Sequence, residues 1–235
     1  MFKSVLPVTF TKFLRRRLDG FPRLAIPILR LTLGQCADQL VSRDTQLLLE
    51  GAGGSGNTFA FMAFKFAQGG DSSVKIAGHT HYSAQVILAV RWRIPVLILI
   101  RDPIASIDSL VCRNIFSNKY EQISFARLCL LDYITFYKSI APHKDKCVIS
   151  KFENTVNNIN YCIENINFKY GCNFSFFDDS EEGMRSCFGD WRTPLASGSR
   201  TTRGNAYGSI LSENSLQSLI VKAQICYKEL ELVAI

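Results

Sequence analysis

A glycine-rich turn near residue 50 has the spacing of a phosphate-binding loop. Residues 47–58 read LLLEGAGGSGNT, which matches G-x-x-x-x-G-K-[ST] except that Asn57 occupies the lysine position. Glycines let backbone N–H groups point inward at an anion, and a helix that begins after the loop adds its positive end. The loop is therefore predicted to bind a phosphate, the alternative being a plain strand-to-helix turn. Ordinary ATP chemistry is not expected, because it needs the lysine charge between the β- and γ-phosphates.

A second candidate anion site follows the apolar run 95–100. Arg101 stands at the end of this run, Pro103 suits the first turn of a helix, and Ser109 lies two turns further on. A guanidinium and a hydroxyl in this arrangement could hold one phosphate. The alternative is an ordinary salt-bridged helix start, in which Ser109 is only a residue on the helix face.

Two histidines, His79 and His81, lie between these features in the sequence, directly after another apolar run. An imidazole titrates near neutral pH, so either ring is suited to act as a general base. A metal-ligand pair is a weaker interpretation because no carboxylate or cysteine accompanies them, and we expect no bound metal. The third interpretation is that both are structural and hydrogen-bond to backbone at a strand end.

Alternating strand and helix patterns position these residues. Apolar runs predict strands at 46–50, 73–77, 95–100 and 146–150, and helical patterns lie at about 57–69, 82–92, 104–115, 121–140 and 154–168. This order is typical of an α/β fold: a parallel β-sheet flanked by helices on both faces, in a P-loop-like three-layer α/β/α arrangement. Ligands bind such sheets at the carboxyl ends of the strands. Residues 171–212 lack periodicity and are expected to form a long loop or lid, before a final helix that starts near Ser212.

Composition indicates one domain with a basic extension. The chain has 235 residues, of which 47% are hydrophobic and 20% charged, enough for a substantial core. We place a single domain at 46–235, after a basic arm and helix at 1–45. The net charge is +7, and residues 1–30 hold seven Lys and Arg against Asp19 alone. The arm could contact a membrane surface or an acidic partner, act as a leader, or form a solvated basic face. Nucleic acid is not expected as a partner, because no basic stripe with aromatics follows the arm.

The cysteines and the apolar runs bear on location. Eight cysteines are scattered without a C-x-x-C pair, which favours free buried thiols, a reducing compartment and thus the cytoplasm. No apolar run reaches membrane-spanning length, because Arg30 interrupts one candidate and Arg91 and Arg93 interrupt another. We therefore expect a soluble protein with no transmembrane segment.

In their order along the chain, these pieces resemble the sulfotransferase family that uses 3′-phosphoadenosine 5′-phosphosulfate (PAPS). The family's P-K-S-G-T-T-W loop is similar to Gly53-Gly54-Ser55-Gly56-Asn57-Thr58-Phe59, and its K-T-H element is similar to His79-Thr80-His81. Its Arg and Ser, eight residues apart, match Arg101 and Ser109. Residues 150–154 resemble its Y-E-D segment, and Arg203-Gly204 ahead of 212–214 resembles its late R-x-G or R-K-G element and terminal helix. The similarity covers roughly residues 46–232.

The resemblance implies an enzyme that moves a sulfuryl group from PAPS to a hydroxyl or amine of a small molecule or glycan, without a metal. It makes His81 the catalytic base and puts His79 where the family has a second lysine. Its donor site would combine loop amides for the 5′-phosphate, a clamp for the 3′-phosphate and an aromatic ring against the adenine. These groups would be Ser55, Gly56, Asn57 and Thr58, then Arg101, Ser109 and Arg203, and lastly Phe59.

One departure from the family affects the expected rate. The loop lysine that assists the leaving group falls at Gly54 here, and loss of such a group costs on the order of a hundredfold in rate. A slow or degenerate sulfotransferase is therefore expected. Two alternatives stay open: a P-loop nucleotide kinase or hydrolase with Asp102 holding a metal, and a non-catalytic nucleotide-binding protein tethered by its basic arm.

Overall fold

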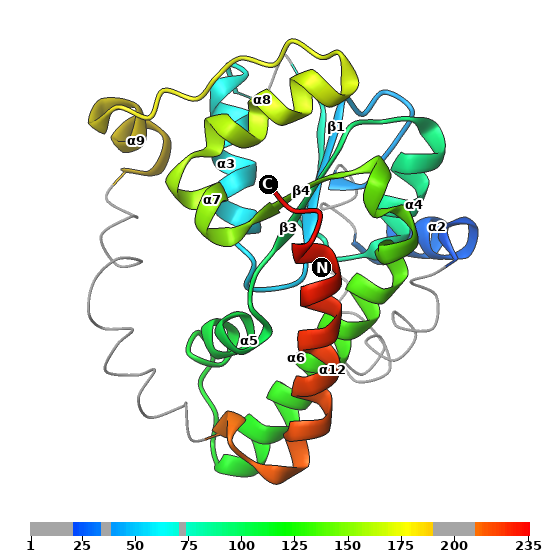
Figure 1. Cartoon of the computed structure of the whole chain (residues 1–235), viewed down its shortest axis with the longest axis vertical. Helices are drawn as coiled ribbons and strands as arrows, with labels where there is room; N and C mark the ends of the chain where they lie inside the picture. Colours follow the sequence, from blue (N-terminus) through cyan, green and yellow to red (C-terminus); the bar gives the residue numbers. More distant parts are fainter. Residues whose placement is uncertain (1–20, 34–38, 71–73, 190–209) are drawn as a thin grey trace.

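Four of the apolar runs form one parallel sheet. The computed structural model describes residues 21–33, 39–70, 74–189 and 210–235. Its sheet has the order β2-β1-β3-β4, with β1 at Leu47–Gly51, β2 at Ile76–Gly78, β3 at Val96–Ile100 and β4 at Val148–Lys151 (Figure 1). Every neighbouring pair of strands is parallel. The predicted α/β fold with a parallel sheet is confirmed.

Helices cover both faces of the sheet, because successive side chains of a strand point to opposite faces. Leu48 of β1 belongs to one buried cluster, together with residues of α4 (Ser83–Trp92), α6 (Lys119–Ile140) and α12 (Asn214–Glu231). Leu47 and Leu49 belong to a second cluster, with residues of α3 (Asn57–Ala67) and α8 (Ile159–Tyr170). Figure 1 shows α6 and α12 side by side, away from α3 and α8. The three-layer arrangement is therefore present.

The other described helices flank these layers. They are α2 at Pro22–Leu33, α5 at Pro103–Val111, the 3-10 helix η2 at Ala141–Lys146, α7 at Phe152–Asn157 and α9 at Glu181–Phe188. Ile26 and Leu29 of α2 are buried in the same cluster as α4. This helix, which the sequence placed in the N-terminal segment, thus packs on the α/β layers, while residues 1–20 of the basic arm lie outside the described part.

Several predicted boundaries were wrong, and capping explains the main ones. The helix expected at 154–168 is split into α7 and α8, because the side chain of Asn158 caps α8 by accepting a hydrogen bond from the Tyr161 N–H. The expected loop at 171–212 contains α9, whose N-cap Ser180 accepts from the Gly183 N–H. The second strand spans Ile76–Gly78 instead of 73–77.

Neither a membrane-spanning helix nor a disulfide is present in the described residues. None of the helices in these ranges is long and apolar enough to cross a membrane. The seven cysteines within the same ranges are free thiols.

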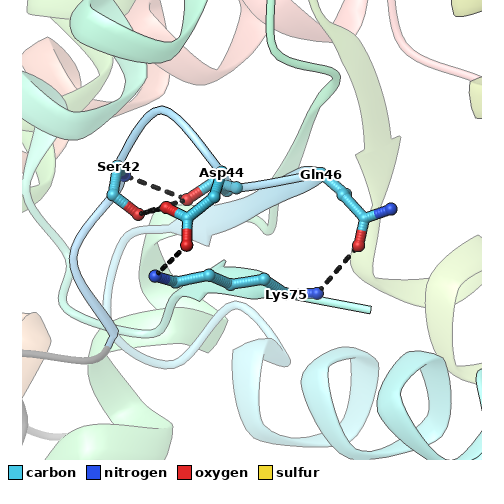
Figure 2. Close-up of polar contacts among 5 residues, drawn as sticks. Ser42, Asp44, Gln46 and Lys75 are labelled. Atoms are coloured by element: carbon cyan, nitrogen blue, oxygen red, sulfur yellow. Dashed lines mark hydrogen bonds and ion pairs between the residues drawn. The ribbon is translucent and has the colours of Figure 1, made fainter. Parts of the chain in front are cut away.

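A polar cluster joins the segment before β1 to the segment before β2 (Figure 2). The Lys75 ammonium lies 2.9 Å from Asp44 Oδ2, and the Lys75 backbone N–H donates to Gln46 Oε1 at 3.0 Å. The Ser42 hydroxyl also donates to Asp44. Hydrogen bonds from Lys75 and Ser42 hold the pKa of Asp44 at about 2, below its ordinary value of 3.8.

This cluster predicts acid-dependent stability. The ionised Asp44 carboxylate contributes stability that is fully present above pH 3.8 and is lost as the pH falls through about 2. Asp44→Asn should therefore lower the free energy of unfolding near neutral pH and match the wild type at the acid end, as measured by urea unfolding across the pH range. The effect should be small and should shrink at high salt, because the pair is exposed.

Lys75→Gln provides the matched control for this prediction, since it removes the main partner and leaves the carboxylate. This variant should reduce the loss of unfolding free energy that the wild type shows as the pH falls from 3.8 to about 2. The wild type and the Asp44→Asn variant should not differ in stability by the same amount at both ends of the pH range. An equal difference between them at low and neutral pH would show that the charge of Asp44 does not contribute the stability.

Candidate functional site

The glycine-rich loop connects the carboxyl end of β1 to the first turn of α3. Gly56 is the N-cap of α3, has a positive φ of 90° and supplies no side-chain cap to the helix. The first N–H groups of an α-helix have no partner within the helix, so they can bind an anion. A glycine-rich turn that ends in a helix start is consistent with the predicted phosphate cradle, and phosphate binding stays a prediction.

The loop lies directly on α5. Ser106 Oγ donates to the Gly53 carbonyl at 2.8 Å, and a Cβ added to Gly54 would lie 2.5 Å from the Ser106 carbonyl oxygen. Gly54 also has φ 87°, which L side chains rarely adopt. The position at which the resembled family has its loop lysine therefore has no room for any side chain.

Asn57, at the lysine position of the P-loop pattern, is turned inward. Its side chain is 3% exposed, and Nδ2 donates to the carbonyls of Ala52 at 3.0 Å and Gly51 at 3.3 Å. Asn57 Oδ1 is buried and has no hydrogen-bond partner among the described residues. The carboxamide thus stabilises the loop by bonding to two of its carbonyl groups. The predicted anion contact of Asn57 would then be made by its backbone N–H.

Tyr137 of α6 supports the loop through hydrogen bonds, and sequence reasoning had no signal by which to find it. Its hydroxyl donates to the Leu99 carbonyl at 2.7 Å, accepts from the Ala52 N–H at 3.2 Å and lies 3.2 Å from Ser55 Oγ. Burial raises the pKa of Tyr137, so the hydroxyl keeps its proton. The Ser55 N–H donates to the Ala52 carbonyl at 3.2 Å. The N–H and the hydroxyl of Ser55 are therefore both used in contacts that stabilise the loop itself. This differs from the predicted role of Ser55 as a donor to an anion.

The two histidines contact this loop through their rings. His79 Nε2 lies 3.1 Å from Thr58 Oγ1, and His81 Nδ1 lies 2.7 Å from the Gly51 carbonyl oxygen. A carbonyl only accepts, so His81 Nδ1 carries a proton and the lone pair of the neutral ring is on Nε2. Burial, and next the nearby His81, lower the pKa of His79. The ring centroids are 5.5 Å apart.

Glu50 holds the turn that carries these histidines. It is fully buried and accepts hydrogen bonds from the Thr80 N–H at 3.0 Å, from Thr80 Oγ1 at 2.7 Å and from the His81 N–H at 2.9 Å. Sequence reasoning missed this residue, although a glutamate inside a fully buried apolar strand was a readable signal.

Arg101 and Ser109 have different partners. Arg101 Nη1 donates to the Gly54 carbonyl at 3.0 Å, and its guanidinium lies 4.0 Å from the ring centroid of Phe152. Ser109 Oγ accepts from Arg113 Nη2 at 3.1 Å. The serine of α5 that contacts the loop is Ser106, three residues earlier.

The remaining predicted residues either contact other side chains or backbone, or lie outside the described part of the chain. Phe59 is stacked on Phe188 of α9, with ring centroids 4.9 Å apart and an interplanar angle of 8°. Arg203 and Gly204 lie outside the described residues. Asp102 caps α5 by accepting from the Ala105 N–H at 3.0 Å. In the part of the chain that the structure describes, no group of three or more His, Cys, Asp or Glu side chains is arranged to hold a metal ion.

No protein-family model matches this chain, and no curated protein matches it. The sulfotransferase resemblance therefore depends on the motifs and on the contacts that link them.

Packing of the loop against α5 predicts a large difference between two glycines of similar conformation. Gly54 and Gly70 have φ values of 87° and 86°, but a Cβ at Gly70 would meet nothing within 4 Å among the described residues. Gly70→Ala should cost only the left-handed conformation, about 1–2 kcal/mol of unfolding free energy. Gly54→Ala should cost a further 1–3 kcal/mol, roughly, because its methyl group meets backbone. Chemical denaturation measures both, and equal losses would show that α5 does not confine the loop.

Proposed function

We propose that this protein is a sulfotransferase that moves a sulfuryl group from PAPS to a hydroxyl or amine of a small molecule or glycan. One observation supports it: two motifs that are distant in the sequence from the glycine-rich loop, the histidine turn and Arg101, both contact that loop. His79 contacts Thr58, His81 contacts Gly51, and Arg101 contacts Gly54. Their order along the chain is that of the resembled family.

The proposed roles follow from the chemistry of the groups. Sulfuryl transfer needs a base for the acceptor's proton, donors around the transferring group and positive charge near the departing phosphate. His81 takes the acceptor's proton on Nε2 as the acceptor heteroatom bonds to sulfur. The donor supplies the sulfuryl group and leaves as adenosine 3′,5′-bisphosphate. The N–H groups at the start of α3 and the Thr58 hydroxyl bind the 5′-phosphate.

Arg101 is the cation closest to the loop among the contacts described above. Its guanidinium is fixed between the Gly54 carbonyl and the Phe152 ring. Because Gly54 has no room for a side chain, we assign the charge that a loop lysine would supply to Arg101. In this proposal Arg101 does not form a clamp for the 3′-phosphate together with Ser109, because the Ser109 hydroxyl accepts from Arg113 instead.

A non-catalytic nucleotide-binding protein is the second candidate. The inward Asn57 carboxamide and the confined Gly54 favour it, because both positions that could carry a loop lysine are used for packing. The kinase alternative is weaker, since Asp102, its proposed metal ligand, is used as a helix cap.

Nucleotide titration tests the donor site. Adenosine 3′,5′-bisphosphate should bind, and ATP with magnesium should compete poorly, by isothermal calorimetry. Arg101→Ala should weaken the bisphosphate by about 2 kcal/mol or more, because a charge-assisted contact to phosphate is lost. Arg113→Ala is the matched control, since this arginine lies just after α5, donates a hydrogen bond to Ser109 and should leave affinity unchanged. Tighter ATP binding, or a larger effect at Arg113, would contradict the proposal.

Replacing the base should separate binding from turnover. His81→Ala should leave donor affinity nearly unchanged and reduce turnover by about two to four orders of magnitude, because the base acts on the acceptor. A panel of phenols, alcohols, amines and sugars with labelled PAPS measures it. His79→Ala is the control: if it abolishes turnover while His81→Ala does not, the roles are reversed. Bisphosphate binding with no turnover on any acceptor would favour the non-catalytic candidate.

A further inference from the structure

The turn that carries the two histidines has an unusual backbone. His79 and His81 have φ values of 62° and 61°, in the left-handed region, and Gly78 before them has φ 136°. A left-handed residue other than glycine is strained, so two of them close together need strong local contacts. Gly78 is the last residue of β2, and a Cβ there would lie 1.8 Å from the Leu49 carbonyl oxygen, so the strand end from which the turn starts has no room for a side chain.

The Glu50 carboxylate provides those contacts. Oε1 accepts from the Thr80 N–H, from Thr80 Oγ1 and from Gln85 Nε2 at 3.1 Å, while Oε2 accepts from the His81 N–H at 2.9 Å. Each of these partners is a donor, and an ionised carboxylate is an acceptor-only group. The side chain is completely buried, so losing a partner there costs more than it would at the surface.

His81 is held at two points by consecutive residues of β1. Glu50 fixes its backbone N–H, and the Gly51 carbonyl fixes its ring through Nδ1–H at 2.7 Å. Because β1 is fully buried within the sheet, both contacts define where the ring lies and which nitrogen carries the proton.

We propose that Glu50 is the positioning residue of this site: by holding the 79–81 turn in its left-handed conformation, it keeps His81 in the Nδ1–H tautomer with Nε2 as the proton-accepting nitrogen. The inference rests on the proposed function only where it makes Nε2 the base. Glu50 acts through His81 and has no contact of its own with the reactants.

Glu50→Gln tests the role of the charge at nearly constant volume. The glutamine carboxamide has only one acceptor oxygen. If that oxygen keeps the contact with Thr80, the NH2 group of the glutamine faces the His81 N–H, and two donors cannot form a hydrogen bond. In two-bond 1H–15N spectra at about pH 8.5, above the usual imidazole pKa of about 6.5, wild-type His81 should show the Nδ1–H tautomer. The variant should shift toward Nε2–H. His143→Gln, far in sequence from the loop, identifies the third histidine's signals.

Thr80→Val is the matched control, since it removes a hydroxyl that bonds to the same carboxylate but leaves the His81 N–H contact. It should keep the Nδ1–H tautomer. If Glu50→Gln does not fold, Glu50→Asp keeps the charge and withdraws the carboxylate by one methylene. The His81 amide should then exchange with solvent up to about tenfold faster than in the wild type.

Three results would overturn the inference: an Nε2–H tautomer in the wild type, an unchanged tautomer in a folded Glu50→Gln variant, or unchanged His81 exchange in Glu50→Asp. None of these measurements uses a nucleotide. If the bisphosphate fails to bind while the tautomer shifts as expected, the proposed function is wrong and the positioning by Glu50 stands. If PAPS is turned over, Glu50→Gln should lower kcat and leave the KM for PAPS unchanged.

Discussion

A buried carboxylate near the end of an interior strand, β1, holds together the loop and the histidine turn of the candidate site. Glu50 is the residue before the glycine-rich loop. The strand that leads into the loop, β1, therefore also holds the histidine turn that follows β2. Parallel pairing of β1 with β2 brings the two segments to the same edge of the sheet. A charge placed there needs several donors, and the tight turn of 79–81 provides them. The loop, the turn and the sheet edge are thus one structural unit.

The loop differs from a nucleotide-hydrolase loop in what fills it. Asn57 and Tyr137 occupy its interior with neutral groups, and α5 covers it at Gly54. The cation that contacts it, Arg101, comes from the end of β3 and lies against the ring of Phe152, which begins α7 directly after β4. Positive charge at this site therefore depends on the spacing of three neighbouring strands and not on a residue of the loop.

The sequence predicted the sheet because β3 is a continuous apolar run and β1 is apolar up to Glu50, a pattern typical of strands covered on both faces. It placed the loop, the histidines and Arg101 directly after strands, but did not show which atoms of these segments meet. Ser106 and Ser109 differ by three residues, nearly one helical turn, so either fits the pattern, and only the tertiary approach of α5 to Gly53 selects Ser106. Tyr137 could not be found, since it is one aromatic residue among many on a buried helix. The single helix expected at 154–168 and the missed α9 reflect caps at Asn158 and Ser180, which are local signals of a few residues.

The left-handed backbone at position 81 also limits how this chain can vary. Asparagine, aspartate and glycine adopt that conformation with little strain, whereas valine, isoleucine and threonine do not, because branching at Cβ crowds the following carbonyl. Only a few codon changes from histidine are therefore compatible with the turn, and asparagine is one of them. Asparagine at position 81 would keep the backbone of the turn and its N–H on Glu50, while removing the ring that reaches the Gly51 carbonyl, so the fold of this turn does not by itself require histidine.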